Sequence, residues 1–419
     1  MEKVQASIIT IGDELLIGQT IDTNSAWIAQ QLNAAGIWVQ RRVAVGDVRD
    51  AIWRALDEES RLSRIVLVTG GLGPTADDIT KPLLCDYFGG KLVVDERVLA
   101  HVKYLFEQVF RRPGPMLERN LKQAEVPDVC TVLFNRIGTA PGMWFEREGT
   151  VVVSMPGVPQ EMKGLMADEV LPRLKQRFAT PAIAHRTVFT IGAGESMIAE
   201  RIKTFEESLP DTIKLAYLPH FGTVRLRLTA TGADQEALDR EIDTRFSTLC
   251  SLVGDITVVA EDLSMEAYIG RLLREKGKTL ATAESCTGGM LAQQITSIPG
   301  SSLYFMGSVV SYAESVKESL LWVDPAVIAA EGVVSEAVVT QMVKGVLERI
   351  PADYAVATSG IMGPDGGSDK TPVGTVWVAV GNRNKVSARV FHFRYDRGLN
   401  TQLAAMNALN LLRLFVLEN

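Results

Sequence analysis

Short, continuous apolar runs alternate with amphipathic stretches in the first part of the chain. The runs at 7–11 and 65–68 contain no charged residue, which is typical of strands buried on both faces of a parallel sheet. A helical stretch between them has Asn24 or Ser25 as its expected N-cap. This strand–helix order predicts a doubly wound α/β domain over residues 1–178, with ligands bound beyond the carboxyl ends of its strands.

Two further segments follow an interruption of the periodicity near residue 180. Residues 185–260 have a β-α-β-β-α-β pattern, which predicts a small split-βαβ, KH-like module. Its turn Gly192-Ala193-Gly194-Glu195 is loosely similar to the loop of an RNA-binding KH module, but it contains an acidic residue and no basic neighbour. We interpret the module as a spacer or an oligomer contact. Strands and helices alternate again over residues 263–419, which predicts a third, α/β domain.

A small turn with hydroxyl groups follows the apolar run at 279–283. The turn is Glu284-Ser285-Cys286-Thr287-Gly288-Gly289, and a helix is expected from Met290 to Thr296. A hydroxyl in such a turn lies among free N–H groups at the positive end of a helix dipole. That position suits a nucleophile whose reaction develops an oxyanion.

A proton acceptor for this hydroxyl has to be something other than histidine, because the stretch contains none. Lys317 is the candidate base, on a helix whose expected capping box is Ser311 with Glu314. The alternative is structural: Ser285 and Thr287 cap a helix, and Lys317 lies on a solvated face. Spacing alone favours this structural alternative.

A second candidate site is the loop after the strand at 65–68, with the sequence Thr69-Gly70-Gly71-Leu72-Gly73-Pro74-Thr75-Ala76-Asp77-Asp78. Its three glycines allow backbone amides to approach a phosphate closely, and its two aspartates offer hard oxygens to a divalent cation. The alternative is a tight turn in which Thr75 and Asp78 form a capping box for a helix with Pro82 in its first turn. A similar loop at 155–159, with Glu161 beyond it, favours a site.

The composition narrows the classes of partner. The chain has 419 residues and a formal charge of −7, which disfavours broad contact with nucleic acid or anionic lipid. Its four cysteines form no C-x-x-C pair, and no apolar run approaches membrane-spanning length. We expect a cytoplasmic protein in a reducing environment, with neither a membrane nor a nucleic acid as partner.

Several long motifs resemble those of one family, the CinA (competence/damage-inducible protein A) family. The first group, Gly12-Asp13-Glu14-Leu15-Leu16-Ile17-Gly18, Asp22-Thr23-Asn24 and the loop 69–75, is similar to the N-terminal half of that family, which resembles molybdopterin-binding domains. The second group, 283–289 and Ser359-Gly360-Ile361-Met362-Gly363-Pro364-Asp365-Gly366-Gly367, is similar to its nicotinamide-nucleotide amidase domain. The resemblance covers nearly the whole chain.

For the C-terminal domain, the resemblance implies hydrolysis of the carboxamide of nicotinamide mononucleotide to nicotinate mononucleotide and ammonia, without a cofactor. Ser285 would correspond to the nucleophile, assisted by Tyr312 and Lys317. Cys286 is the rival nucleophile, and the choice of serine rests on the family match. The residues assigned to substrate binding in this domain are Thr287, Gly288, Gly360, Gly363 and Arg397.

For the N-terminal domain, the resemblance implies metal-dependent cleavage of the pyrophosphate of ADP-ribose. We assign substrate binding to Asn24, Gly70, Gly71, Gly73 and Thr75, and the divalent metal ion to Asp77, Asp78, Glu14 and Glu161. The partners expected are small nucleotides and a second copy of the chain in a homodimer.

The chain departs from the family pattern at a few positions. Asn400 stands where related amidase domains often carry a second arginine, so we expect a weaker phosphate contact at Arg397. Met362 and Pro82 are also unusual for the family. Two alternatives remain open at this point: a non-catalytic partner protein in competence or DNA repair, and an N-terminal domain that only binds a pterin or nucleotide.

Overall fold

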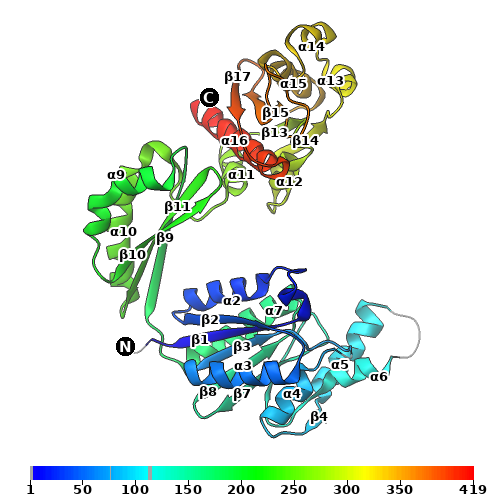
Figure 1. The fold of residues 1–419 in the computed structure, drawn as a ribbon, viewed down its shortest axis with the longest axis vertical. Coiled ribbons are helices and arrows are strands. Elements are labelled where there is room, and N and C mark those ends of the chain that lie inside the picture. The colour runs from blue at the N-terminus through cyan, green and yellow to red at the C-terminus, as the bar shows by residue number, and fades with distance from the viewer. Residues whose placement is uncertain (1–2, 76, 112–115) are drawn as a thin grey trace. The chain divides into compact units, whose positions relative to one another are not determined.

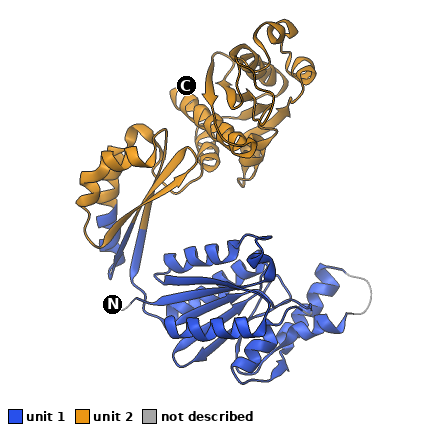
Figure 2. Cartoon of the chain, in the orientation of Figure 1, with its two compact units in different colours: residues 1–184, 229–242 blue, residues 185–228, 243–419 orange. Residues whose placement is uncertain are grey.

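The computed structural model describes residues 3–75, 77–111 and 116–419. The chain divides into two compact units, Met1–Ala184 with Thr229–Ile242 and His185–Leu228 with Asp243–Asn419 (Figure 2). Each unit contains its own clusters of buried apolar side chains.

The first unit is built on a six-stranded sheet with the strand order β2-β1-β3-β8-β7-β6 (Figure 1). The strands β2, β1, β3 and β8 are parallel to one another. Strand β7 pairs antiparallel with β8, and β6 pairs antiparallel with β7. The strands are β1 (Gln5–Ile11), β2 (Trp38–Val45), β3 (Ile65–Thr69), β6 (Thr131–Leu133), β7 (Gly142–Arg147) and β8 (Thr150–Met155). The elements around them are α1 (Asp13–Leu16), α2 (Thr23–Ala34), α3 (Arg49–Leu62), α4 (Thr80–Tyr87), α5 (Glu96–Tyr104), α6 (Glu118–Leu121), α7 (Pro159–Leu165), α8 (Leu171–Arg177) and the two-stranded sheet of β4 (Leu92–Val94) and β5 (Glu125–Pro127).

Helices cover both faces of this sheet, because alternate strand residues point to opposite sides. On one face Ile8 packs with Ile28 of α2. On the other face Ile9 packs with Ile52 of α3 and Leu84 of α4. The predicted doubly wound domain is therefore confirmed.

The N-cap of α2 differs from the prediction. The cap is Asp22, whose side chain accepts a hydrogen bond from the Ser25 amide at 2.9 Å. Neither Asn24 nor Ser25 is the cap, because both already lie inside the helix. Either aspartate or asparagine can cap a helix, so local sequence did not separate these neighbouring positions.

The predicted split-βαβ module comes next along the chain; its residues Thr229–Ile242 belong to the first unit, and most of the rest belongs to the second. Its antiparallel sheet has the order β10-β11-β9-β12, and two helices pack on it (Figure 1). The elements are β9 (Ala182–Ile191), α9 (Glu195–Glu207), β10 (Ile213–His220), β11 (Thr223–Gly232), α10 (Gln235–Leu252) and β12 (Thr257–Val259). Phe189 of this sheet belongs to the same apolar cluster as Ile269 and Leu409 of the C-terminal domain.

The C-terminal domain is an α/β layer structure with the strand order β14-β13-β15-β16-β17. The strands β14, β13 and β15 are parallel to one another. Strand β16 pairs antiparallel with β15, and β17 pairs antiparallel with β16. The strands are β13 (Leu280–Glu284), β14 (Phe305–Val310), β15 (Tyr354–Gly360), β16 (Thr375–Gly381) and β17 (Val386–His392); the helices are α11 (Met265–Glu275), α12 (Met290–Thr296), α13 (Glu314–Leu321), α14 (Pro325–Glu331), α15 (Glu336–Arg349) and α16 (Arg397–Glu418). Residues of α11, α12 and α16 cover one face, and residues of α14 and α15 cover the other.

This topology brings three predicted turns to one edge of the sheet. The segments that follow β13, β14 and β15 all leave from the carboxyl ends of parallel strands. The close approach of α13 and α15 sets the position of the helix that carries Lys317. A Cβ on Gly345 of α15 would overlap the Leu321 carbonyl at the end of α13.

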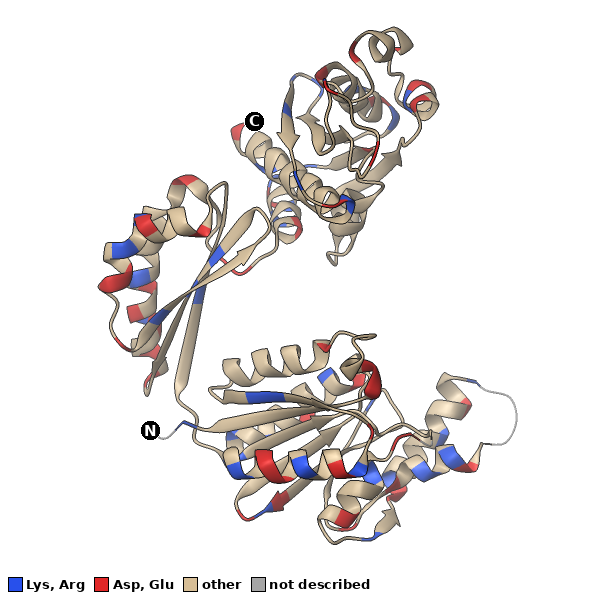
Figure 3. Ribbon diagram, in the orientation of Figure 1, with Lys and Arg blue, Asp and Glu red and all other residues tan. Residues whose placement is uncertain are grey.

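Charged residues of both signs are interspersed along the described elements, for example along α3 (Figure 3). In the part of the chain that the structure describes, no helix is long and apolar enough to cross a membrane.

The Gly345 contact predicts a specific stability effect. Gly345→Ala should destabilise the C-terminal domain by roughly 1–3 kcal/mol, because the added methyl group forces α13 away from α15. The loss of stability is measured by unfolding the protein in urea, with hydrogen exchange of peptides from α13 and α15 as the readout. Lys344→Ala, at the exposed neighbouring position, should change stability by no more than about 0.5 kcal/mol. Equal stability of the two variants would contradict the packing argument.

Candidate functional site

Ser285 follows directly after β13 and is held by the neighbouring strand. Its amide donates to the Thr358 carbonyl of β15 at 3.0 Å, and the residue is 7% exposed. The Gly288 amide donates back to the Ser285 carbonyl at 3.1 Å, which closes the turn. The hydroxyl therefore belongs to a tight, buried turn at the carboxyl edge of the sheet.

Lys317 lies against this hydroxyl. Its Nζ atom is 2.9 Å from Ser285 Oγ, and it also donates to the carbonyls of Ser311 at 2.7 Å and Tyr312 at 3.1 Å. The side chain is 1% exposed, and this burial lowers the pKa of the amine. The alternative in which Lys317 lies on a solvated face is contradicted by its burial.

The predicted capping box before Lys317 is not formed. The N-cap of α13 is Ala313, and no side chain caps this helix. Ser311 instead continues the line of β14: its amide donates to the Glu284 carbonyl at 2.8 Å. Its buried hydroxyl has no partner among the described residues. Ser311 thus contributes its carbonyl to Lys317 rather than its hydroxyl to a helix.

Glu284 is a buried residue that the sequence analysis did not single out. Its carboxyl group accepts hydrogen bonds from the amides of Gly289, Leu291 and Ala292, at 3.0, 3.0 and 2.9 Å. The free N–H groups expected at the start of α12 are therefore already bound. No signal in a single sequence distinguishes this glutamate from a surface residue, apart from its place inside an apolar run.

Thr287 and Gly288 have largely structural contacts. The Thr287 hydroxyl donates to Glu284 at 2.8 Å and is 2.8 Å from the Thr358 hydroxyl. Gly288 has φ +61°, a left-handed conformation that glycine adopts without strain. Gly360 ends β15, and a Cβ there would press on Val376 and on the Thr375 carbonyl of β16.

Cys286 is buried, with 7% exposure. Burial raises the pKa of its thiol to about 12. A thiolate is the nucleophilic form of cysteine, so this environment disfavours the rival nucleophile.

Tyr312 and Arg397 meet at the exposed rim of the same edge. The Arg397 guanidinium donates to the Tyr312 hydroxyl at 2.9 Å and to the Gly363 carbonyl at 2.9 Å. The Tyr312 ring is 62% exposed, and only its backbone carbonyl contacts Lys317. The structure thus brings the Tyr312 hydroxyl to Arg397 rather than to Lys317.

Asn400 is a buried structural residue. Its side-chain amide donates to the carbonyls of Met362 at 3.1 Å and Tyr395 at 2.8 Å. It also accepts from the Tyr395 amide at 3.1 Å. Asn400 therefore fixes the loop before Gly363 relative to the start of α16, a role that a solvated arginine would not take.

The N-terminal glycine loop lies at the carboxyl end of β3. Its Gly70 amide donates to the Met155 carbonyl at the end of β8 at 3.1 Å, and Gly70 and Gly71 have φ +117° and +63°. Asp78 accepts from the amides of Gly73 at 2.8 Å and Thr75 at 2.9 Å. Asp78 therefore closes the turn, whereas the N-cap of α4 is Ile79.

The loop at 155–159 lies beside the glycine loop. The Asn24 side chain donates to the Gly157 carbonyl at 2.7 Å, and the Thr69 hydroxyl donates to the Pro156 carbonyl at 2.8 Å. Glu161 accepts from the Asn135 side chain at 2.7 Å, and burial raises the pKa of its carboxyl group. The structure thus brings Asn24 and the two loops together, with Glu161 held by a residue that the sequence analysis missed.

Carboxylates that could bind a cation lie near Asp47, which was also missed. Burial raises the pKa of Asp47, and the hydrogen bond from the Asp13 amide lowers it. The negative charges of Asp13, Glu14 and Asp77 add to the increase, and the net pKa is raised. Among the described residues, no three histidine, cysteine, aspartate or glutamate side chains are grouped closely enough to hold a metal ion. A magnesium-like ion needs only one or two carboxylates when substrate phosphates supply other ligands. Of the four predicted ligands, Glu14 and Asp77 raise the pKa of Asp47 through their charges, whereas Asp78 accepts from the Gly73 amide and Glu161 accepts from Asn135.

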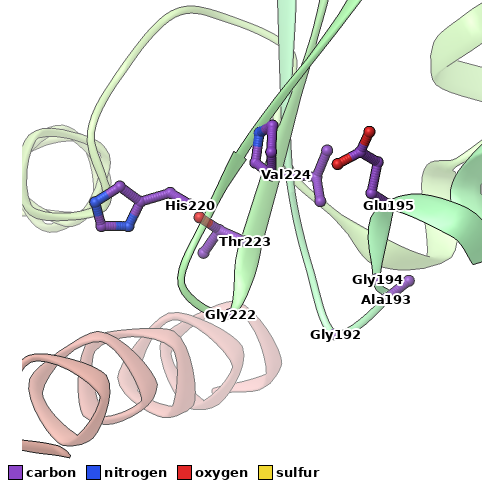
Figure 4. Close-up of a pocket in the computed structure, with 9 residues that line it drawn as sticks. Gly192, Ala193, Gly194, Glu195, His220, Gly222, Thr223 and Val224 are labelled. Atoms are coloured by element: carbon purple, nitrogen blue, oxygen red, sulfur yellow. The ribbon is translucent and has the colours of Figure 1, made fainter. Parts of the chain in front are cut away.

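A hollow of about 330 Å³ lies in the split-βαβ module, between the turn Gly192–Glu195 and the end of the β10–β11 hairpin (Figure 4). Figure 4 shows the side chains of Glu195 and His220 on different sides of it. None of the predicted site residues lines this hollow.

Comparison with known proteins accounts for all three parts of the chain. Residues 7–176 match the probable molybdopterin binding domain, residues 185–255 the damage-inducible protein CinA KH domain, and residues 262–416 the CinA C-terminal domain. A CinA-like protein of Flavobacterium psychrophilum is 45% identical over 417 residues, or 99% of each chain. A CinA-like protein of Cytophaga hutchinsonii is 45% identical over 98% of this chain and 97% of its own.

Solved structures are similar to a part of the chain. A crystal structure of a competence-damaged protein (CinA) superfamily member from Klebsiella pneumoniae is 34% identical, covering 37% of this chain and 97% of its own, with a TM-score of 0.36. The full-length similarity to CinA-like proteins and the three matching domain models together show that this chain belongs to the CinA family.

Proposed function

We propose that the C-terminal domain is an amidase that hydrolyses the carboxamide of nicotinamide mononucleotide, giving nicotinate mononucleotide and ammonia. The observation that carries this proposal is the 2.9 Å separation of Lys317 Nζ and Ser285 Oγ in a buried site. An aliphatic hydroxyl needs a neighbouring base to become a nucleophile near neutral pH.

In this mechanism Lys317 acts as a neutral amine. A neutral amine has two N–H donors and one lone pair, whereas an ammonium group has three donors. The carbonyls of Ser311 and Tyr312 accept the two N–H groups, which leaves the lone pair for the Ser285 hydroxyl. Burial, by lowering the pKa of Lys317, favours this neutral form.

The reaction then follows from these positions. Ser285 Oγ attacks the carboxamide carbon, and its proton passes to Lys317 Nζ. When the carbon–nitrogen bond breaks, the same proton leaves with the amine as ammonia. Water then hydrolyses the ester on Ser285 and restores the hydroxyl. Among the described residues, the amide of Thr287 donates to no backbone acceptor, so it is available to a developing oxyanion.

Recognition of the nucleotide is assigned to Arg397. Its guanidinium is at the exposed rim, next to Tyr312 and Gly363, and arginine binds phosphate in a fork geometry. In this proposal Tyr312 orients Arg397, and the turn carbonyl of Tyr312 supports Lys317.

We also propose that the N-terminal domain cleaves the pyrophosphate of ADP-ribose with a divalent metal ion. The supporting observation is that the glycine loop and the loop at 155–159 meet at the carboxyl ends of β3 and β8, where open α/β sheets bind ligands. Glu14, Asp77 and Asp47 would hold the ion, which would neutralise charge on the phosphoryl oxygens. A domain that binds a nucleotide or pterin without cleaving it is the competing interpretation.

The serine mechanism predicts the effect of removing either member of the pair. Ser285→Ala and Lys317→Ala should each lower ammonia release from nicotinamide mononucleotide by about 10³-fold or more, roughly 4 kcal/mol of barrier. Cys286→Ala should stay within about tenfold of the unmodified protein. An inactive Cys286→Ala with an active Ser285→Ala would show that cysteine is the nucleophile. Wild-type protein without ammonia release would favour a non-catalytic partner protein.

The burial of Cys286 predicts its resistance to alkylation. Iodoacetamide at pH 8 should modify Cys286 at least about tenfold more slowly in the folded protein than in urea, because little thiolate forms while the pKa is about 12. Peptide mass spectrometry measures the modified fraction over time. Equal rates in both states would contradict the inert-thiol interpretation.

Metal dependence predicts that the two activities separate. Treatment with EDTA should abolish cleavage of ADP-ribose and leave ammonia release unchanged, because only phosphoryl transfer needs the cation here. Added magnesium should restore cleavage, which chromatography of AMP and ribose 5-phosphate follows. Cleavage that persists unchanged in EDTA would rule out the metal.

A further inference from the structure

The carboxyl group of Glu284 accepts several hydrogen bonds, none of them from the Ser285 hydroxyl. Its Oε2 accepts from Thr287 Oγ1 and from the amides of Gly289 and Leu291. Its Oε1 accepts from the Ala292 amide at 2.9 Å. The residue is 0% exposed, and an unpaired buried carboxyl would be costly. The bonds therefore have to be present whenever the domain is folded.

These bonds fix the turn that carries Ser285. Glu284 is the residue before the nucleophile, and its side chain reaches forward over the turn to the first residues of α12. The Ser285 backbone is thus held on one side by the Thr358 carbonyl and on the other by the closed loop of Glu284 onto α12.

The same carboxyl group also contacts the strand that supports the base. Thr282 Oγ1 donates to Ser308 Oγ of β14 at 2.8 Å, and Ser308 Oγ lies 3.4 Å from Glu284 Oε1. Three residues beyond Ser308, Ser311 offers its carbonyl to Lys317. Glu284 therefore contacts both the turn of the nucleophile and the strand whose end holds the amine.

We propose that Glu284 is a positioning residue, which sets the distance and direction between the Ser285 hydroxyl and the Lys317 amine by binding the start of α12 and β14 at once. The inference rests on the proposed function only in taking Ser285 as a nucleophile. It does not depend on which amide is the substrate. Glu284 touches neither reacting atom, so its effect should fall on the reaction step rather than on substrate binding.

The test measures Ser285 reactivity directly with a fluorophosphonate probe. In labelling, Ser285 Oγ bonds to phosphorus, fluoride leaves, and Lys317 takes the hydroxyl proton. Glu284→Gln keeps the size of the side chain but turns an NH₂ group toward at least one backbone N–H. It should slow labelling about 10- to 100-fold, the scale of a misplacement of about 1 Å. With nicotinamide mononucleotide, kcat should fall by the same factor and KM should change less than about threefold.

Asp353→Asn is the matched control. Asp353 accepts from the Thr279 amide at 2.9 Å and from the Thr279 hydroxyl at 2.8 Å, so it pins the opposite end of β13. This variant and Glu284→Gln should both lower the thermal midpoint, but in Asp353→Asn the labelling rate should change less than about twofold. A similar loss of reactivity in both variants would show that Glu284 contributes only to the stability of the domain, and it would overturn the inference.

The remaining outcomes also decide the question. If folded Glu284→Gln is labelled at the wild-type rate, Glu284 does not position the pair. If Glu284→Gln fails to fold, Ser308→Ala decides in its place, with slower labelling by about threefold or more supporting the inference and an unchanged rate opposing it. Wild-type protein labelled at Ser285 without ammonia release would reject the amide substrate alone. Absence of wild-type labelling would reject both proposals.

Discussion

The C-terminal domain is organised around an amine buried next to a hydroxyl. A charged ammonium group is costly to remove from water, and the Lys317 side chain is almost completely buried. Two backbone carbonyls accept from it, and no carboxylate forms an ion pair with it among the described residues. Burial disfavours the charged form and lowers the pKa of Lys317. The packing that buries Lys317 therefore both lowers the pKa of its amine and places the amine against the Ser285 hydroxyl.

Burial of that amine depends on packing far from it in the sequence. The helix that carries Lys317 ends against Gly345 of α15, and its start is set by the end of β14. Parallel pairing of β14, β13 and β15 then brings Ser311, Ser285 and Thr358 to one edge. Three turns that are separated in the sequence thus become one site, because parallel strands share the direction of their carboxyl ends.

Several side chains with the chemistry of ligands form hydrogen bonds that hold the backbone of their loops. Asp78 closes the glycine loop, Glu161 binds Asn135, and Thr287 binds Glu284 and Thr358. Asn400 likewise fixes a loop through three hydrogen bonds. Polar groups near a functional edge are often needed to hold irregular backbone in place. In the N-terminal domain, the proposed cation is assigned to the exposed Glu14 and Asp77, together with the half-buried Asp47.

The sequence by itself determined the α/β architecture, the split-βαβ module and the family, because apolar periodicity and ordered motifs are local properties of the chain. It also identified Ser285 and Lys317 as candidates. Only the tertiary structure decided that Lys317 is buried, that Glu284 binds the N–H groups of α12, and that the Tyr312 hydroxyl faces Arg397. Each of these depends on which segments distant in sequence pack together, and neither spacing nor propensity encodes that packing for a single residue.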